Sequence, residues 1–364
     1  MENRVIFHVD FDYFYAQCEE IRNPEIRTKP VAICIFSDRG DDSGAIATAN
    51  YKAREYGVKS GIPIKFAKNR LGNQKDAVFI PADFDYYSQI STHGMKIIES
   101  FGDIFEYVGR DEAYLDVTIK TRNNFENAAH LAQQLKNEIR KKLKMTCSVG
   151  VSPNKLLSKI GSDFKKPDGL TIIKPEQISE FLSPLTIRNI PGIGKKTELI
   201  LSEMDCKIIK DLLSMDVFEL NNKFGRKTGT YIYNAARGVD LEPVKEKQST
   251  IQFSKITTLK KNSKNYEFLC ENMLKLCKQI HVTTLENNKM FRSIGIQFVN
   301  EDLSMKTKSK MLKNPTTNLN ELERTATYLL NEALRDQELL VRRLGVRISE
   351  LTDLKGQSNI TNYF

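Results

Sequence analysis

The chain has 364 residues, of which 40% are hydrophobic and 28% charged, with a net charge of +9. This balance is typical of a soluble protein, and because no apolar run approaches the ~18 residues of a transmembrane helix, we predict no membrane partner. The six cysteines form no C-x-x-C pair, which argues against a zinc site or a disulfide framework and fits a reducing cytoplasm, while the positive charge fits a polyanionic partner.

The first half of the chain predicts alternating strands and helices. Residues 5–11 and 31–36 are short, apolar and rich in β-branched or aromatic side chains, which is typical of strands. Residues 45–58 predict a helix that ends at Gly57. Further along we expect a strand, a break and a strand over residues 104–119, an amphipathic helix over 125–143, a strand at 146–152 and a helix from Asn154. This order indicates an α+β domain.

The pattern changes after about residue 174. Residues 176–238 predict helices with two glycine-containing turns, "IPGIGKK" and "FGRKTG". Residues 241–248 are polar and charged and predict a linker. Residues 249–350 mix strands, at 294–299 and 342–348, with helices at 265–280 and 318–335. The segment 249–364 carries 18 Lys and Arg against 12 Asp and Glu, so this part of the chain is basic.

Acidic side chains interrupt two of the predicted strands. Asp10 lies in an apolar strand, and Asp111 and Glu112 follow Gly109, where a hairpin tip would let both face one site. Converging carboxylates repel each other, and either protonation or a divalent cation resolves this repulsion. Oxygen ligands without Cys or His favour Mg²⁺, and two such ions suit displacement at phosphorus. The spacing alone leaves open that these acids only cap turns or pair with Lys and Arg. The four histidines show no metal-ligand spacing, and we assign them to structure.

Several positions suit phosphate binding. Tyr51 and Arg54 would share one helix face, and Lys166 lies in a loop that can reach a phosphate. Residues 189–201 predict a helix-hairpin-helix in which Gly192 and Gly194 allow the turn, and Lys195 and Lys196 follow at the start of the next helix. A solvated surface cation or an ordinary helical turn is the alternative at each position.

Four motifs in order, "VDFDYFYAQCEE", "SGAIATANYKAREYGVKSGIP", "DEAYLDV" and "CSVGVSPNKLLSKIGSDFKKPDGL", resemble the Y-family DNA polymerases of the DinB, or DNA polymerase IV, type. The resemblance covers essentially the whole chain and is closest to archaeal members. It implies an α+β, multidomain, right-handed polymerase. The implied domains are a ferredoxin-like palm (1–13 and 80–173), fingers (14–79), a helical thumb (174–240), a linker (241–248), an α/β little finger (249–351) and a flexible tail (352–364).

The resemblance also implies roles for single residues. Asp10, Asp111 and Glu112, with the backbone carbonyl of Phe11, would bind two Mg²⁺, for which Mn²⁺ can substitute. Tyr15 would be a steric gate that rejects the ribose 2′-OH, next to Tyr13 and Phe14 in the nucleotide site. The remaining implied sites are a triphosphate site (Thr48, Tyr51, Arg54, Lys166), a DNA-binding surface (Gly192, Gly194, Lys195, Lys196, Arg342, Arg343) and a motif for a PCNA-type sliding clamp (Gln357, Ile360, Tyr363, Phe364).

The implied function is template-directed, low-fidelity DNA synthesis past damaged bases from dNTPs on primer-template DNA, without a proofreading exonuclease. We expect a cytoplasmic, nucleoid-associated monomer. Two other interpretations stay open from the residues alone: a palm-type nucleotidyl cyclase, and a non-catalytic DNA-binding scaffold that recruits a clamp. One departure from the family pattern is the pair Gly109–Arg110, where the family usually has Ser and an apolar residue.

Overall fold

The computed structural model describes residues 4–37, 39–40, 42–246, 250–335 and 337–354. They form two compact units, which lie within Met1–Ile35 plus Ala45–Gln248 and within Phe36–Gly44 plus Ser249–Phe364. Among the described residues, no helix is both long and apolar enough to cross a membrane.

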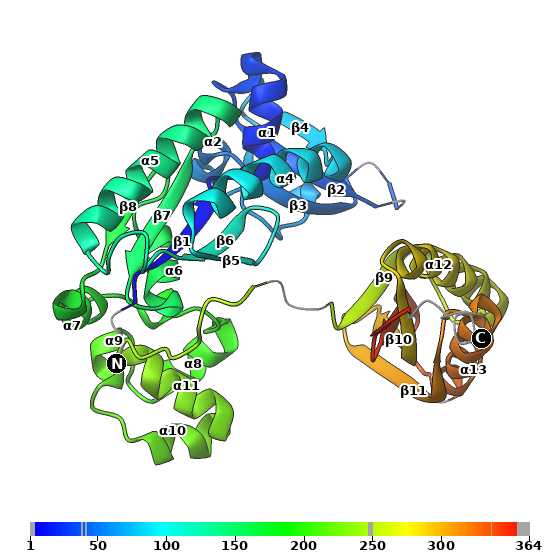
Figure 1. Ribbon diagram of the computed structural model, residues 1–364. Helices are drawn as coiled ribbons and strands as arrows, with labels where there is room; N and C mark the ends of the chain where they lie inside the picture. The colour runs from blue at the N-terminus through cyan, green and yellow to red at the C-terminus, as the bar shows by residue number, and fades with distance from the viewer. Residues whose placement is uncertain (1–3, 38, 41, 247–249, 336, 355–364) are drawn as a thin grey trace, which may run out of the picture. The chain divides into compact units, whose positions relative to one another are not determined.

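A five-stranded sheet organises the first unit, with the strand order β5-β6-β1-β7-β8 (Figure 1). The central strand β1 is antiparallel to both of its neighbours, and β7 is parallel to β8. The predicted strands are therefore present, including the strand-break-strand of the hairpin. The strands are β1 (Ile6–Phe11), β5 (Ile104–Tyr107), β6 (Glu112–Asp116), β7 (Cys147–Ser152) and β8 (Leu170–Ile172).

Helices pack on both faces of this sheet. Helices α1 (Phe14–Arg22), α4 (Phe84–Phe101) and α5 (Phe125–Leu143) share one core with the β1 side chains Val9 and Phe11. Because strand side chains alternate, His8 and Asp10 lie on the opposite face. There α6 (Lys155–Phe164) packs against β1 and β7. The predicted helix over 125–143 and the helix from Asn154 are both confirmed, and Asn154 caps α6.

The prediction of one helix over residues 45–58 is wrong. Residues Gly44–Ala49 form the strand β3, and only Tyr51–Glu55 is helical, as α2. The small side chains of β3 fit a sheet, and tertiary pairing overrides the helix propensity of alanine. Asn50 separates the two elements, since its side chain accepts hydrogen bonds from the backbone N–H groups of Ala53 and Val31. The sheet β3-β2-β4 also contains β2 (Val31–Phe36) and β4 (Val78–Pro81), and α3 (Ile64–Arg70) packs nearby.

Short helices with their own core make up the rest of the first unit. They confirm the helical interpretation of residues 176–238. The helices are α7 (Ile178–Leu182), α8 (Lys195–Glu203), α9 (Ile209–Leu212), α10 (Val217–Phe224) and α11 (Arg226–Ala236), with 3-10 turns at Pro175–Gln177 and Ile187–Asn189; a further 3-10 turn, Pro24–Ile26, follows α1.

The second unit is a four-stranded antiparallel sheet with the order β11-β10-β12-β9, packed against two helices (Figure 1). The predicted strands and helices of this part are confirmed, although α12 extends beyond its predicted end. The elements are β9 (Gln252–Ser263), α12 (Tyr266–Glu286), β10 (Lys289–Asn300), β11 (Met305–Thr316), α13 (Leu319–Leu334) and β12 (Val341–Ser349); the short β13 (Thr352–Asp353) pairs with β10.

One glycine sets how closely α6 approaches the sheet. A Cβ added to Gly150 in β7 would lie 1.9 Å from the backbone oxygen of Ser158 and 2.6 Å from the backbone nitrogen of Ser162. Backbone atoms of a helix cannot move aside cheaply, so only glycine fits at this position.

We predict that Gly150→Ala destabilises the first unit by about 3 kcal/mol or more, the upper range for overpacked cores. Thermal unfolding followed by circular dichroism measures the effect. Gly194→Ala is the matched control, because no described atom lies within 4 Å of the added Cβ and its φ is negative. Equal melting temperatures for the two variants would contradict the close approach of α6.

Candidate active site

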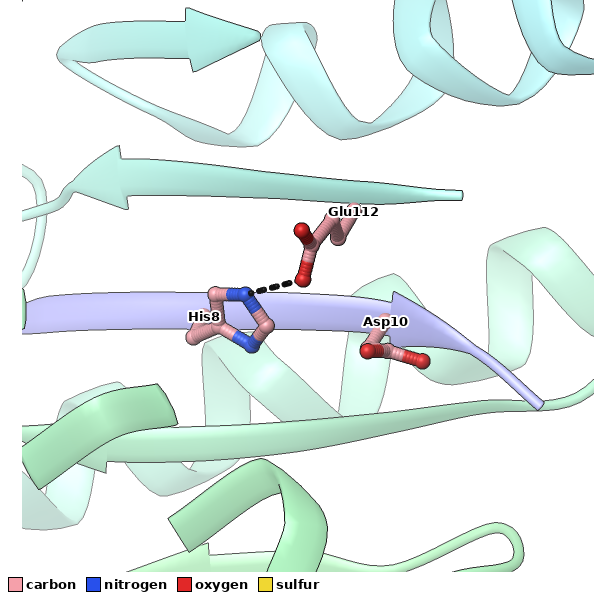
Figure 2. A group of neighbouring side chains, drawn as sticks. All are labelled: His8, Asp10 and Glu112. Atoms are coloured by element: carbon pink, nitrogen blue, oxygen red, sulfur yellow. Dashed lines mark ion pairs between the residues drawn. The ribbon is translucent and has the colours of Figure 1, made fainter. Parts of the chain in front are cut away.

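Three ionisable side chains meet on the face of the sheet that α6 covers. Asp10 of β1 lies directly opposite Glu112 of β6 in the antiparallel register, and His8 shares the face of Asp10. The His8 ring nitrogen and the two carboxylate oxygens all lie within 4.8 Å of one another (Figure 2). Asp111 directly precedes β6, and its backbone oxygen accepts a hydrogen bond from Phe11 N at 2.8 Å. The hairpin therefore brings Asp111 and Glu112 to one end of β1, as predicted.

Asp10, Asp111 and Glu112 form an acidic cluster, and two lysines pair with its carboxylates. Lys166 Nζ lies 2.7 Å from Asp10 Oδ1, and Lys159 Nζ lies 2.5 Å from Glu112 Oε2. Burial raises the pKa of Asp10 to about 7 although Lys166 opposes the shift. Burial and the neighbouring Glu112 also raise the pKa of Asp111. The site therefore holds more buried negative charge than its surroundings favour.

His8 is part of the site, which sequence reasoning missed when it assigned the histidine to structure. Its Nδ1 lies 2.7 Å from Ser162 Oγ, and its Nε2 lies 3.2 Å from Glu112 Oε2. Burial lowers the pKa of His8 to about 4, so the ring is neutral at pH 7. Contact with His8 and the salt bridge with Lys159 lower the pKa of Glu112 to about 2 against the effect of its burial. The signal for His8 was its i, i+2 spacing from Asp10 on a strand.

These residues fit a hard divalent cation. Asp10, Asp111 and Glu112 supply carboxylate oxygens, the ligands that Mg²⁺ prefers. The raised pKa values of Asp10 and Asp111 show that positive charge at this position would be stabilising. His8 lies beside two of these carboxylates, while Asp111 is not a member of the His8–Asp10–Glu112 group.

A cavity of about 250 Å³ opens beside the cluster. The hydroxyl of Tyr51 is buried there and has no hydrogen-bond partner among the described residues. Arg54 lies over the Tyr51 ring, 4.8 Å from its centroid, so the predicted shared helix face is confirmed. The cavity is lined by all seven residues predicted to bind nucleotide (Tyr13, Phe14, Tyr15, Thr48, Tyr51, Arg54, Lys166), by Asp10, Phe11 and Asp111, and by Ala47 and Ser60.

Aromatic packing fixes the ring of Tyr15 at the cavity wall. It stacks on Tyr87 with a centroid distance of 4.8 Å and meets the edge of Phe84 at 5.7 Å. The Phe11 and Phe14 rings, in contrast, stack on each other inside the core and are almost fully buried. Of the three aromatics in "YFY", Phe14 thus offers the cavity chiefly its backbone.

Asp12, the residue that follows β1, makes structural contacts. Its carboxylate accepts hydrogen bonds from Ser148 Oγ and from the backbone N–H of Asp168, both at 2.8 Å. Asp168 also pairs with Lys136 of α5 at 2.9 Å. These contacts fix the loop that carries Lys166, so Asp12 supports the site without facing the acidic cluster.

Arg110 turns toward α4. Its Nε donates to Ser88 Oγ at 3.2 Å, and its guanidinium lies 5.4 Å from the Phe84 ring centroid. The Gly109–Arg110 pair therefore leaves the acidic cluster intact.

The predicted DNA-binding residues lie in two places. Gly192 has a positive φ of 85°, and Gly194 is the N-cap of α8, which begins with Lys195 and Lys196. Arg342 and Arg343 lie on β12 of the second unit, where Arg343 Nε donates to Thr258 Oγ1 at 2.9 Å. The predicted clamp-binding residues Gln357, Ile360, Tyr363 and Phe364 fall outside the described residues.

Family models match three successive parts of this chain, and a relative matches its full length. Residues 9–163 match the impB/mucB/samB family, residues 188–240 the thumb domain of DNA polymerase iota, and residues 251–361 the C-terminal domain of the impB/mucB/samB family. A DNA polymerase IV of Nitrosopumilus maritimus is 64% identical over 364 residues and covers 100% of both chains.

Solved structures give the same result. A Y-family DNA polymerase chimera of Dbh and Dpo4 superposes with a TM-score of 0.90 at 36% identity, covering 96% of this chain and 99% of its own. An insertion ternary complex of Dbh DNA polymerase superposes with a TM-score of 0.69 at 37% identity, covering 95% and 98%. The multidomain α+β fold, the matched domains and the full-length similarity together show that the chain belongs to the Y family of DNA polymerases.

Proposed function

We propose that this chain extends a primer on a DNA template by nucleotidyl transfer, with low fidelity and past damaged bases, without proofreading. The observation that carries the proposal is one cavity lined both by Asp10 and Asp111 and by Tyr51, Arg54 and Lys166. Carboxylates for metal and cations for phosphate are thereby joined in one space of about 250 Å³. The small Ala47 on the wall leaves room for an irregular base pair.

The proposed domains follow the predicted boundaries: palm 1–13 and 80–173, fingers 14–79, thumb 174–240, linker 241–248, little finger 249–351 and tail 352–364. The acidic cluster lies in the palm segments, and Thr48, Tyr51 and Arg54 come from the fingers segment. Primer and nucleotide would accordingly meet where β1 ends and α1 begins.

Asp10, Asp111, Glu112 and the Phe11 carbonyl are the residues that would hold two Mg²⁺ or Mn²⁺. When bound, such ions activate the primer 3′-hydroxyl and neutralise the triphosphate and pyrophosphate. The chain's own groups position the nucleotide: Lys166 and Arg54 bind phosphate oxygens, and the unpartnered Tyr51 hydroxyl donates a hydrogen bond to one of them. The ring of Tyr15 would clash with an added 2′-oxygen of the bound sugar.

Primer-template DNA and dNTPs are the proposed partners. Support comes from the Dbh structure described as an insertion ternary complex and from the positive charge of this chain, +9 overall. The α8 N-terminus, with Lys195 and Lys196, and the β12 arginines Arg342 and Arg343 would hold the DNA backbone without reading bases. We further propose a monomer in the cytoplasm at the nucleoid that binds a PCNA-type clamp through the tail; this last proposal rests on sequence alone.

We expect Asp111→Ala and Glu112→Ala to lower primer extension by at least about a thousandfold. Removing a single group that stabilises charge in a transition state already lowers the rate ~10²–10³-fold. Gel-based extension of a labelled primer measures this loss, and a mobility shift checks that DNA binding persists. Asp76→Ala, in an exposed loop, is the control for losing a carboxylate. Near-normal extension by either site variant would refute the assignment.

Replacing Tyr15 tests the steric gate. Tyr15→Ala removes the ring and should lower discrimination between dNTPs and rNTPs by at least about tenfold, which corresponds to ~1.4 kcal/mol of transition-state free energy. Single-nucleotide incorporation kinetics with dATP and ATP measure the ratio. Tyr15→Phe keeps the ring and should keep the discrimination. If Tyr15→Phe also failed to discriminate, the hydroxyl and not the ring would be responsible.

DNA binding by the thumb should depend on salt. Lys195→Ala and Lys196→Ala each remove one cation that would neutralise a phosphate, so each should reduce the slope of log affinity against log salt concentration by about 1. Fluorescence anisotropy of labelled primer-template at several salt concentrations gives this slope. Lys141→Ala on the exposed surface of α5 is the control. A slope equal to that of the control would show that the thumb binds DNA through other residues.

A further inference from the structure

Lys166 contacts two carboxylates and also lines the cavity. Its ammonium lies 2.7 Å from Asp10 Oδ1 and 2.7 Å from Asp163 Oδ1, so it bridges the two carboxylates. It also lines the cavity together with Tyr51 and Arg54. The two flanking carboxylates favour the charged form of the Lys166 side chain. A triphosphate in the cavity and Asp10 would therefore compete for the same ammonium.

The contacts of Glu112 differ from those of Asp10. Glu112 contacts Lys159 and His8, and His8 is itself held by Ser162. Lys159, His8 and Ser162 are not among the described residues that line the cavity. A nucleotide would leave these contacts in place, whereas the contact of Asp10 with Lys166 can be exchanged.

The positive charge of Lys166 affects how tightly Asp10 can bind a metal ion. An ammonium 2.7 Å from the carboxylate oxygen occupies one lone-pair direction and repels a second cation. A triphosphate carries several negative charges and offers charge-assisted hydrogen bonds to the same ammonium. Once Lys166 has moved to the phosphates, Asp10 loses its counter-ion and its affinity for a divalent cation rises.

We propose that Lys166 couples nucleotide binding to metal binding: in the free protein it blocks Asp10, and the incoming triphosphate draws it away and opens Asp10 to a divalent cation. Lys166 is thus a positioning residue for the metal site as well as a phosphate ligand. The inference rests on the proposed function, because it needs Asp10 as a metal ligand and a triphosphate in the cavity. By linkage, nucleotide and metal strengthen each other's binding by the same factor.

The test is Mn²⁺ binding to the full chain at pH 8 without nucleotide, followed by the electron paramagnetic resonance signal of free Mn²⁺. Lys166→Gln, and Lys166→Met as a second neutral variant, should bind Mn²⁺ at least about fivefold more tightly than the wild type, the lower end of usual coupling factors. Removing the Lys166 charge also strengthens proton binding to Asp10, and protons compete with Mn²⁺. The variants should still bind Mn²⁺ more tightly, because a divalent ion gains twice as much as a proton from the loss of a neighbouring positive charge.

Matched variants separate this effect from general electrostatics. Lys165→Gln removes the same charge from the adjacent, exposed position, and we expect it to change Mn²⁺ affinity less than twofold. Lys166→Arg keeps the positive charge, so we expect it to bind Mn²⁺ as weakly as the wild type does. Circular dichroism checks that each variant is folded.

A second arm adds exchange-inert chromium(III)–dATP at saturation, so that the nucleotide itself cannot chelate Mn²⁺. The nucleotide should then tighten Mn²⁺ binding at least about fivefold in the wild type and less than twofold in Lys166→Gln.

Equal Mn²⁺ affinity for Lys166→Gln and Lys165→Gln, or equal nucleotide effects in wild type and Lys166→Gln, would overturn the coupling. Asp10→Asn shows which idea has failed, because it should abolish this Mn²⁺ site. If Asp10→Asn binds Mn²⁺ like the wild type, the metal-ligand assignment in the proposed function is wrong. If Asp10→Asn loses the Mn²⁺ site while Lys166→Gln and Lys165→Gln bind Mn²⁺ equally, only the coupling is wrong.

Discussion

The like charges on neighbouring strands are the constraint on which the rest of the structure depends. The register of β1 and β6 places Asp10 directly opposite Glu112 on a buried face, and Asp111 lies next to Glu112 at the hairpin end. Taking carboxylates out of water is costly, and placing them side by side adds repulsion. The fold offsets this cost by placing Lys166 at Asp10 and Lys159 at Glu112. Both lysines come from α6 and the loop after it.

The position of α6 therefore determines which side chains reach the acidic residues. Gly150 lets the helix backbone approach β7, and this close approach brings Lys159 and Ser162 within reach of Glu112 and His8. The loop after α6 is held in place by Asp12, which accepts a hydrogen bond from the backbone of Asp168. Asp12, which directly follows β1, thus supports the site indirectly by fixing the segment that carries Lys166.

The binding cavity is assembled from segments far apart in sequence. The β1–α1 turn supplies the aromatic wall, β3 and α2 supply Thr48, Tyr51 and Arg54, and the loop after α6 supplies Lys166. The Tyr51 hydroxyl has no hydrogen-bond partner among the described residues, and the Lys166 ammonium lies between two carboxylates, so in the proposed function each would gain a contact with a phosphate. The second unit has its own sheet, helices and core, so its basic side chains do not depend on this site.

The sequence by itself determined four strands of the main sheet, the helices over 125–143 and from Asn154, and the acidic trio, because alternation and helical spacing are local signals, while the family resemblance supplied the full set of nucleotide-site residues. It did not predict β8 or the 18-residue helix α4. It predicted the wrong element for residues 44–49, where pairing with β2 outweighed the helix propensity of alanine. It also missed His8, Lys159, Ser162 and Asp163. The contacts of His8, Lys159 and Ser162 join β1, β6 and α6 across more than 40 residues of sequence, and only the tertiary structure decides which cation meets which carboxylate. Burial created that pairing, since a buried charge must find a partner wherever the fold supplies one.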